Sequence, residues 1–313
     1  MNINHFQLMK LALEMEEQSE HKTHKVGALL YNDGKHIARH NFWAASLEKY
    51  IGRYDKLGNA STTIHAEMAV ISAAESTKDA SIYITDLPCP NCAKLIAEAR
   101  ISAVYIDSHT HNTPLGLKIK PYFDDISTLI FKRAGIAVYE MNEPKRGIHE
   151  IISPPRDNIL QAIHRPVKQL PLEHSDINQT RFLEIINAQK GNVNFAACYA
   201  KSILGHYVFL FAQPHRSVGL LEEDAKIISD KQNKYEPTLQ PINQLLVACA
   251  RYGLTIDPKY LYSSQTPTSR EFVNMLGAGY SSLQVGNPEK CRDKWGLQAL
   301  NQLKKHGIIE LNI

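Results

Sequence analysis

The chain has 313 residues, of which 43% are hydrophobic, and a formal net charge of +3 at pH 7. This length is about twice that of a typical ~150-residue domain, so we expect two packed cores. The small charge is spread along the chain, which argues against a nucleic-acid partner. No apolar run approaches the ~20 residues of a membrane span and the first ten residues lack a signal-peptide layout, so we expect a cytoplasmic protein without a membrane partner.

The first half of the chain predicts alternating strands and helices. Asn32-Asp33-Gly34 between two apolar runs indicates a β-hairpin. Residues Ile64 to Ala74 contain no Gly or Pro, and Thr62 or Thr63 can cap the helix that they predict. The predicted elements are strands at 26–31, 36–41, 81–85, 103–106 and 136–141, and helices at 64–74 and 89–99.

Two short motifs at the starts of the predicted helices carry chemistry. His65-Ala66-Glu67 is followed by Pro88-Cys89-Pro90-Asn91-Cys92. Two thiolates and one imidazole favour Zn²⁺ in a tetrahedral shell, and three protein ligands leave one position open, as in catalytic sites. We therefore predict His65, Cys89 and Cys92 as zinc ligands.

Glu67 is the predicted catalytic acid and base. It lies two residues from His65, too close on a helix to reach the same ligand position, so it fits a proton carrier beside the metal. Cys89 and Cys92 fall in the first turn of the second helix, where exposed N–H groups and the helix dipole stabilise thiolates.

Other interpretations of these residues are a redox cysteine pair and a closed structural zinc site. A redox pair needs no His-x-Glu motif upstream. A closed site needs a fourth ligand, and His109 or His111 would be the candidates.

Residues 5 to about 141 resemble the cytidine and deoxycytidylate deaminase family, nearest to its dCMP-type branch. The stretch from Pro88 to Ile96 and the strand from Ala103 to Ile106 carry most of this likeness, and the His-x-Glu and Pro-Cys-x-x-Cys motifs are the family's zinc signature. The resemblance implies a three-layer α/β/α fold with a mixed central sheet and a hydrolase that cleaves the C–N bond of a cyclic amidine.

The resemblance also implies substrate contacts. Asn41 would hold the ribose or base, or alternatively is a turn residue that ends the strand. Ala66 lies between the two motif residues. Arg53 in the insert 44–63 is a candidate lid or phosphate contact, with solvated surface as the alternative. The chain departs from the family's pattern at Ala69, where Asn is usual, and at Asn41-Phe42-Trp43, where Asn-Gly is usual.

The second half repeats the order of elements of the first half. The segment Ala69–Ala74 corresponds to Leu245–Ala250 at an offset of 176, and Pro88 and Val104 correspond to Pro267 and Leu283 at an offset of 179. The metal positions are replaced in this copy. The residues at these positions are Pro241, Asn243, Thr268 and Glu271.

We therefore expect a duplicated fold and an intrachain pseudo-dimer, which leaves homo-oligomerisation open. The expected regions are a deaminase domain at 1–142, a Pro-containing linker at 143–180 with a short helix near 158–164, and a catalytically inert copy at 181–313. An unrelated α/β domain is the alternative, since helix and strand orders recur widely.

The expected activity is zinc-dependent deamination of a free cytosine nucleotide or nucleoside, with dCMP as the leading substrate, to the uracil product and ammonia. One alternative keeps the chemistry but acts on a free purine or on adenosine in transfer RNA, because the 51–55 stretch faintly resembles such enzymes. A second alternative is a zinc-stabilised binding or regulatory protein without activity. Glu67 argues against it, since a purely structural site has no use for that carboxylate.

Overall fold

The computed structural model describes residues 4–142, 144–153, 167–189, 191, 194–230 and 235–312. Contacts divide the chain into two compact units, and neither unit is contiguous in sequence. The first unit contains Met1–Phe42, His65–Arg165 and Arg216–Leu239. The second unit contains Trp43–Ile64, Pro166–His215 and Gln240–Ile313.

The first unit is built on a mixed six-stranded sheet of order β10-β9-β8-β7-β1-β2. Strand β1 runs antiparallel to β2 and β7, whereas β7, β8 and β9 are mutually parallel and β10 returns antiparallel to β9. The strands are β1 (Gly27–Asn32), β2 (Lys35–His40), β7 (Ser81–Ile84), β8 (Ala103–Asp107), β9 (Ala137–Asn142) and β10 (Gly147–Ile152). This sheet confirms the expected fold class.

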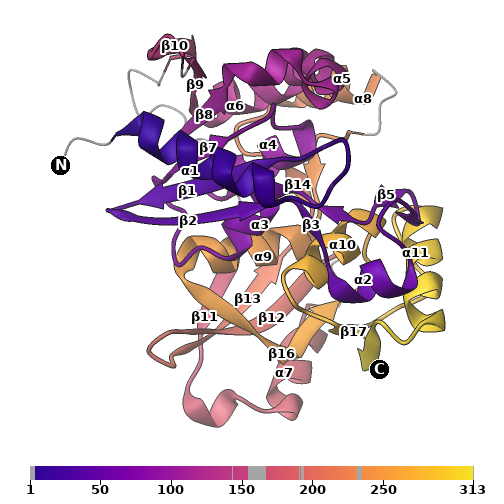
Figure 1. The fold of residues 1–313 in the computed structure, drawn as a ribbon. Coiled ribbons are helices and arrows are strands. Elements are labelled where there is room, and N and C mark those ends of the chain that lie inside the picture. Colours follow the sequence, from indigo (N-terminus) through magenta and orange to yellow (C-terminus); the bar gives the residue numbers. More distant parts are fainter. Residues whose placement is uncertain are drawn as a thin grey trace. The chain divides into compact units, whose positions relative to one another are not determined.

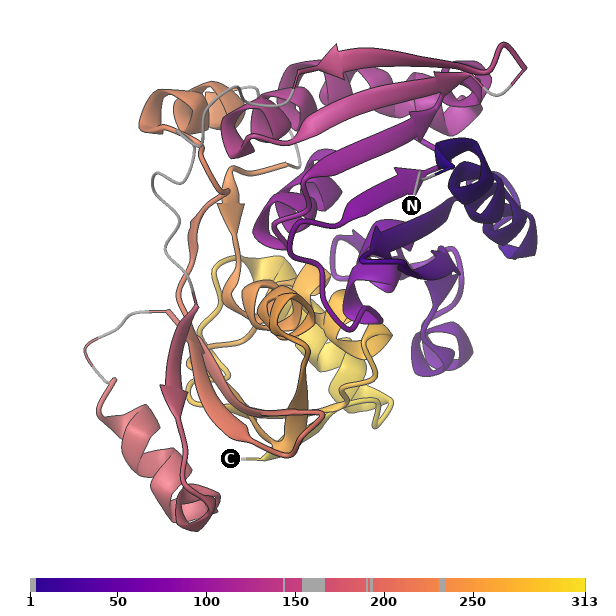
Figure 2. The same cartoon turned by 90° about the vertical axis from the view of Figure 1, so that its left-hand side faces the viewer.

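Helices cover both faces of this sheet (Figure 2). On one face, α1 (His5–Gln18) packs Leu8, Met9 and Ala12 against a cluster that includes Leu29 and Tyr83. The helix approaches β1 so closely that a Cβ at Gly27 would lie 1.9 Å from the Ala12 carbonyl oxygen, so only glycine fits there. The remaining helices of this unit are α3 (Ala66–Ser72), α4 (Pro90–Glu98), η1 (Ser108–Asn112), α5 (Pro114–Tyr122), η2 (Phe123–Ser127), α6 (Thr128–Ala134) and α8 (Glu222–Asp230).

The second unit contains a sheet of order β11-β13-β12-β16-β17-β18, in which five strands match the first sheet and the sixth, β11, lies at the opposite edge from β10. Its central strand β12 is antiparallel to β13 and β16, and β16, β17 and β18 are parallel, as in the first sheet. The strands are β11 (Lys168–Pro171), β12 (Ala196–Ser202), β13 (Tyr207–Ala212), β16 (Leu254–Ser263), β17 (Ser282–Val285) and β18 (Glu310–Asn312). The helices are η4 (His174–Asp176), α7 (Gln179–Asn187), α9 (Pro241–Tyr252), α10 (Ser269–Gly277) and α11 (Lys294–Lys305). The matching topology shows that the fold is duplicated.

The segment expected as a linker contains β structure. Strand β10 extends the first sheet and β11 extends the second, because each pairs antiparallel with the strand at a sheet edge. Residues 143 and 154–166, with the short helix expected near 158–164, lie outside the described residues. Strands β12 and β13 were not among the sequence predictions.

The two copies exchange equivalent segments. We call Trp43–Ile64 the first arm and Arg216–Leu239 the second arm; each follows the second strand of its own copy's hairpin and precedes the next long helix, yet belongs to the other compact unit. In Figure 1 the purple first arm lies beside the yellow α11. The short elements in and next to the arms are β3 (Phe42–Trp43), α2 (Ala45–Tyr50), β4 (Lys56–Leu57), β5 (Ala60–Ser61), β6 (Thr63–Ile64), β14 (His215–Arg216) and β15 (Thr238–Leu239).

Hydrogen bonds fasten each arm within its unit. In the second unit, the Gly58 N–H donates to Gln302 Oε1 at 2.7 Å. In the first unit, Lys94 on α4 is buried and its Nζ donates to the carbonyl oxygens of Glu236 at 2.7 Å and Thr238 at 3.1 Å. Among the described residues, no helix is both long and apolar enough to cross a membrane.

Candidate metal centre

His65, Cys89 and Cys92 come together in the first unit. Their ligand atoms all lie within 4.8 Å of one another, with His65 Nδ1 3.7 Å from Cys89 Sγ and 3.3 Å from Cys92 Sγ. Tetrahedral zinc with ordinary Zn–S and Zn–N bonds separates such sulfur and nitrogen atoms by about 3.5 Å. The donor set therefore fits a zinc ion in both chemistry and spacing.

Two helix starts place these three side chains. His65 is the N-cap of α3 and Cys89 the N-cap of α4, each with extended backbone, and Cys92 is the third residue of α4. Pro90 occupies the first position of α4, where its missing N–H costs no helical hydrogen bond. Both helices thus direct their N-terminal ends, which carry partial positive charge, at the ligand group.

The pKa values of the two buried thiols are shifted in opposite directions. A hydrogen bond from Cys92 lowers the pKa of Cys89 well below its usual value. The same interaction, together with burial, raises the pKa of Cys92. A divalent cation bound between the two sulfur atoms would favour the thiolate form of both.

Glu67 lies beside the three candidate ligands but is not one of them. Its side chain is buried, and burial raises its pKa to about 7 although the neighbouring His65 opposes the shift. Cys92 contacts the carboxyl group through a side-chain hydrogen bond. A carboxyl group that titrates near neutrality next to a metal position is suited to both accepting and donating a proton.

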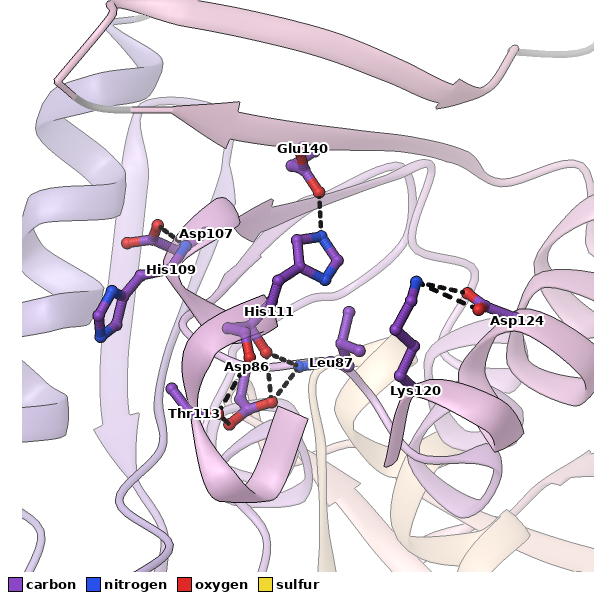
Figure 3. Close-up of polar contacts among 10 residues, drawn as sticks. Asp86, Leu87, Asp107, His109, His111, Thr113, Lys120, Asp124 and Glu140 are labelled. Atoms are coloured by element: carbon purple, nitrogen blue, oxygen red, sulfur yellow. Dashed lines mark hydrogen bonds and ion pairs between the residues drawn. The ribbon is translucent and has the colours of Figure 1, made fainter. Parts of the chain in front are cut away.

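A buried carboxylate anchors the loop that carries Cys89 (Figure 3). Asp86 Oδ1 accepts hydrogen bonds from the Leu87 N–H and the Thr110 hydroxyl, each at 2.6 Å, and Oδ2 accepts from the Thr113 hydroxyl at 3.1 Å. In addition, the Ser127 hydroxyl donates to the Pro88 carbonyl oxygen at 2.9 Å. These contacts hold the backbone on the N-terminal side of Cys89.

Neither histidine considered as a fourth ligand joins the group. Among the described residues, the metal-binding group consists of His65, Cys89 and Cys92. His111 Nε2 contacts the Glu140 carboxylate, while the His109 N–H donates to Asp107 Oδ1 (Figure 3). The fourth position that a closed structural site would need is not supplied by these two residues.

The predicted substrate contacts have other partners in this structure. Asn41 is buried; its Oδ1 accepts from the Ser19 hydroxyl at 2.8 Å and the Val26 N–H at 2.9 Å, and its Nδ2 donates to the His24 carbonyl oxygen at 2.8 Å. This network ties the end of β2 to the loop before β1. A contact between Asn41 and substrate stays a prediction.

Arg53 and Ala66 lie in different units. Arg53 is in the first arm, where its Nε donates to Glu48 Oε1 at 2.6 Å and its guanidinium lies 5.2 Å from the Trp43 ring centre. Ala66 is the first residue of α3 and is fully buried. Their roles toward substrate also stay predictions.

His21 is a neighbour of the ligand group that the sequence did not reveal. It is buried, and its Nδ1 accepts from the Thr23 N–H at 3.3 Å and the His24 N–H at 3.1 Å, which places the ring proton on Nε2. Burial lowers its pKa, and His24 and His65 lower it further. No motif marks this residue, because it lies in a loop 44 positions before His65.

The second copy has different residues at the positions equivalent to the two cysteines. Thr268 is the N-cap of α10, as Cys89 is of α4, and Glu271 takes the third helical position that Cys92 has. Glu271 is buried; Oε1 accepts from the Ile242 N–H at 2.9 Å and Oε2 from the Thr268 N–H at 2.8 Å. Its carboxyl group therefore links the starts of α9 and α10. Counted from the helix caps, Gln240 matches His65, one position earlier than the sequence alignment.

Residues 3–108 match the model of the cytidine and deoxycytidylate deaminase zinc-binding region. The chain is similar to deoxycytidylate deaminase of Enterobacteria phage T4, with 38% identity over 93 residues, covering 28% of this chain and 42% of that protein. It is also similar to deoxycytidylate deaminase of Enterobacteria phage T2, with 40% identity over 87 residues, covering 26% and 39%. The chain thus spans less than half the length of these curated relatives.

Among solved structures, a dCMP deaminase from the cyanophage S-TIM5 in its apo form is similar to this chain. It has a TM-score of 0.33 and 21% sequence identity, and it covers 45% of this chain and 100% of that one.

Proposed function

Because residues 3–108 match the model of the cytidine and deoxycytidylate deaminase zinc-binding region, we propose that this protein is a zinc-dependent hydrolase that deaminates a free cytosine nucleotide or nucleoside. The product is the corresponding uracil compound, with release of ammonia. The leading substrate is dCMP, since the similar phage proteins are deoxycytidylate deaminases.

The observation that carries this proposal is the combination of three metal donors with one buried carboxyl group outside the donor set. The donors match a zinc shell with one open position, and Glu67 lies next to Cys92. Zinc bound there supplies Lewis acidity and makes water nucleophilic near neutral pH.

Glu67 moves the protons of the reaction. Hydrolysis adds water at the carbon that bears the amino group, so one proton must leave the water and one must reach the departing nitrogen. The Glu67 carboxylate takes the first proton from the water and passes it to the ring nitrogen. It then takes the second proton from the added hydroxyl group and passes it to the amino group, which leaves as ammonia. Its pKa of about 7 lets both protonation forms exist near neutrality, which suits a group that accepts and donates in one turnover.

The second copy carries no chemistry in this proposal. Glu271 and Thr268 replace two donors, and the Glu271 oxygens accept hydrogen bonds from backbone N–H groups of both helices. Because both Glu271 oxygens accept these hydrogen bonds, this place has no open position for a nucleophile.

The test is ammonia release by the full-length, zinc-loaded protein from a panel of cytosine, adenine and guanine bases, nucleosides and nucleotides, with transfer RNA as a separate arm. We expect turnover of cytosine compounds, with dCMP the best. Turnover of purines or of transfer RNA would instead support the adenosine alternative. Stoichiometric zinc without ammonia from any compound would contradict the proposal and favour a binding protein.

A further inference from the structure

The zinc ligand His65 follows directly after the end of the first arm. Thr63 and Ile64 are the last arm residues and belong to the second unit, whereas His65 opens α3 in the first unit. His65 makes no side-chain cap hydrogen bond to its own helix. Its backbone is held on the C-terminal side by the Ala69 N–H, which donates to the His65 carbonyl oxygen at 2.9 Å, and on the N-terminal side by its peptide bond to Ile64.

One helix of the second copy holds these two arm residues. Arg270 Nη1 donates to the Thr63 carbonyl oxygen at 3.0 Å. The Ile64 side chain, which is 1% exposed, packs over Gly277 so closely that a Cβ on Gly277 would lie 2.4 Å from Ile64 Cγ1. Both contacts come from α10.

The two contact points lie on the same face of α10. Arg270 and Gly277 are seven residues apart, which is two helical turns. Helix α10 is the counterpart of α4, which carries Cys92 in the first copy. The second copy thus has no cysteine at the positions equivalent to Cys89 and Cys92, while its helix α10 contacts the backbone next to His65.

Contacts other than those of Arg270 and Gly277 hold the rest of the first arm. Gln302 on α11 accepts from the Gly58 N–H at 2.7 Å and donates through Nε2 to the Lys56 carbonyl oxygen at 3.2 Å. A change at Arg270 should therefore leave the arm in place and alter mainly its last two residues.

We propose that Arg270 and Gly277 of the inert copy are positioning residues for the zinc ligand His65, so that metal affinity depends on the C-terminal half of the chain. Arg270 binds the carbonyl group of Thr63, two residues before the ligand. Because Gly277 has no side chain, Ile64 can pack directly against the backbone of α10. The inference rests on the proposed metal site but not on the identity of the substrate.

The test compares zinc affinity, by competition with a chelator, in full-length variants. Arg270→Met keeps the apolar stem and removes the donor, and Gly277→Ala adds a methyl group against Ile64. Removing a group that orients a metal ligand commonly weakens metal affinity about 10- to 100-fold, and we expect a loss in this range. Arg270→Lys should recover part of it, because the ammonium group can still donate.

Cobalt substitution gives a second measurement that a merely structural role would not change. The visible absorption of Co²⁺ bound to two thiolates and an imidazole reports the ligand geometry, and it should shift in Arg270→Met. Arg181→Met, which removes an exposed guanidinium in the same unit, and Gly191→Ala, where an added Cβ meets nothing within 4 Å, are the matched controls. Neither should change affinity or spectrum.

Unchanged zinc affinity and cobalt spectrum in Arg270→Met would overturn the proposal, even if activity fell. If Gly277→Ala does not fold, Arg270→Met and Arg270→Lys decide. If the wild type binds zinc and the variants bind it more weakly, but no compound in the panel releases ammonia, then the positioning role stands and the proposed deaminase function fails. A wild-type chain that binds no zinc would overturn both.

Discussion

The two copies place different side chains at the same junction of two helix starts. In each, the starts of two helices converge, and the N-terminal ends leave N–H groups without helical partners. The first copy places His65, Cys89 and Cys92 there, a set that fits a zinc ion with one open position. The second copy places Glu271, whose oxygens accept N–H groups from both helices. A fold can thus keep the junction of the helices while the open position, and the chemistry with it, is lost.

The exchanged arms show what the second copy contributes to the first. Its second arm supplies the carbonyl groups that satisfy buried Lys94, two residues after Cys92. Its helix α10 holds the end of the first arm. The copies therefore depend on each other even though one of them has no metal donors at the equivalent place.

Removing residues 181–313 is expected to have the largest effect on this interdependence. The fragment would lose the partners of Lys94 and of the first arm, so apolar surface and a buried ammonium group would become exposed. We expect aggregation or re-dimerisation, measured by size-exclusion chromatography with light scattering. A monomeric fragment with full activity would show that the copies are independent.

Replacement of Glu67 tests the chemistry of the first copy alone. Glu67→Ala and Glu67→Gln should keep zinc and fold, but turnover should fall about 10²- to 10⁴-fold because the proton carrier is missing. The control Glu75→Gln changes an exposed carboxylate just after the same helix and should leave turnover unchanged. Retained activity in Glu67→Ala would exclude Glu67 from the mechanism.

Replacement of Glu271 tests the carboxyl link in the second copy. Glu271→Ala leaves buried N–H groups of Ile242 and Thr268 without acceptors, at a cost of about 1–3 kcal/mol in the free energy of unfolding. Urea denaturation measures the change, with exposed Glu289→Ala as the control in the same unit. If Glu271→Ala does not change the free energy of unfolding, the junction of α9 and α10 does not need the carboxyl link.

The smallest predicted effect concerns the second arm, which belongs to the first unit. Arg133 pairs with Asp224, with Nε–Oδ2 at 2.9 Å and an Nη2–Oδ1 hydrogen bond at 3.0 Å. Burial of Asp224 opposes its ionisation, but hydrogen bonds from Arg133 and the Leu221 N–H lower its pKa overall.

Because the folded-state pKa of Asp224 is lowered, the pair stabilises the fold above the unfolded-state pKa near 4, and this contribution disappears as pH falls through the folded-state value. At pH 7, Arg133→Met should lower the free energy of unfolding by up to about 1 kcal/mol. The difference from wild type should shrink below pH 4 in urea denaturation. The control is Lys226→Met, which removes an exposed ion pair from the same arm. A difference between wild type and Arg133→Met that does not depend on pH would contradict this account.

Much of the first copy was predictable because its signals are local. The helix at the His-x-Glu motif was expected from residue 64 and starts at Ala66, and the helix that carries both cysteines was expected from residue 89 and starts at Pro90. The hairpin at Asn32-Asp33-Gly34 also formed as predicted. In the second copy, the order of helices and strands after residue 240 could be aligned with the first, although the helix caps shift the match at His65 by one residue.

The sequence alone predicted which three side chains could hold a metal and that the order of elements repeats, because the two motifs lie at predicted helix starts and because periodicity reports each strand and helix locally. Only the tertiary structure decided where the arms belong, what Asn41 bonds to, and that Arg270 lies against the residue pair before His65. Such contacts join positions up to about 200 residues apart through single hydrogen bonds and close packing, which leave no repeating pattern in the chain.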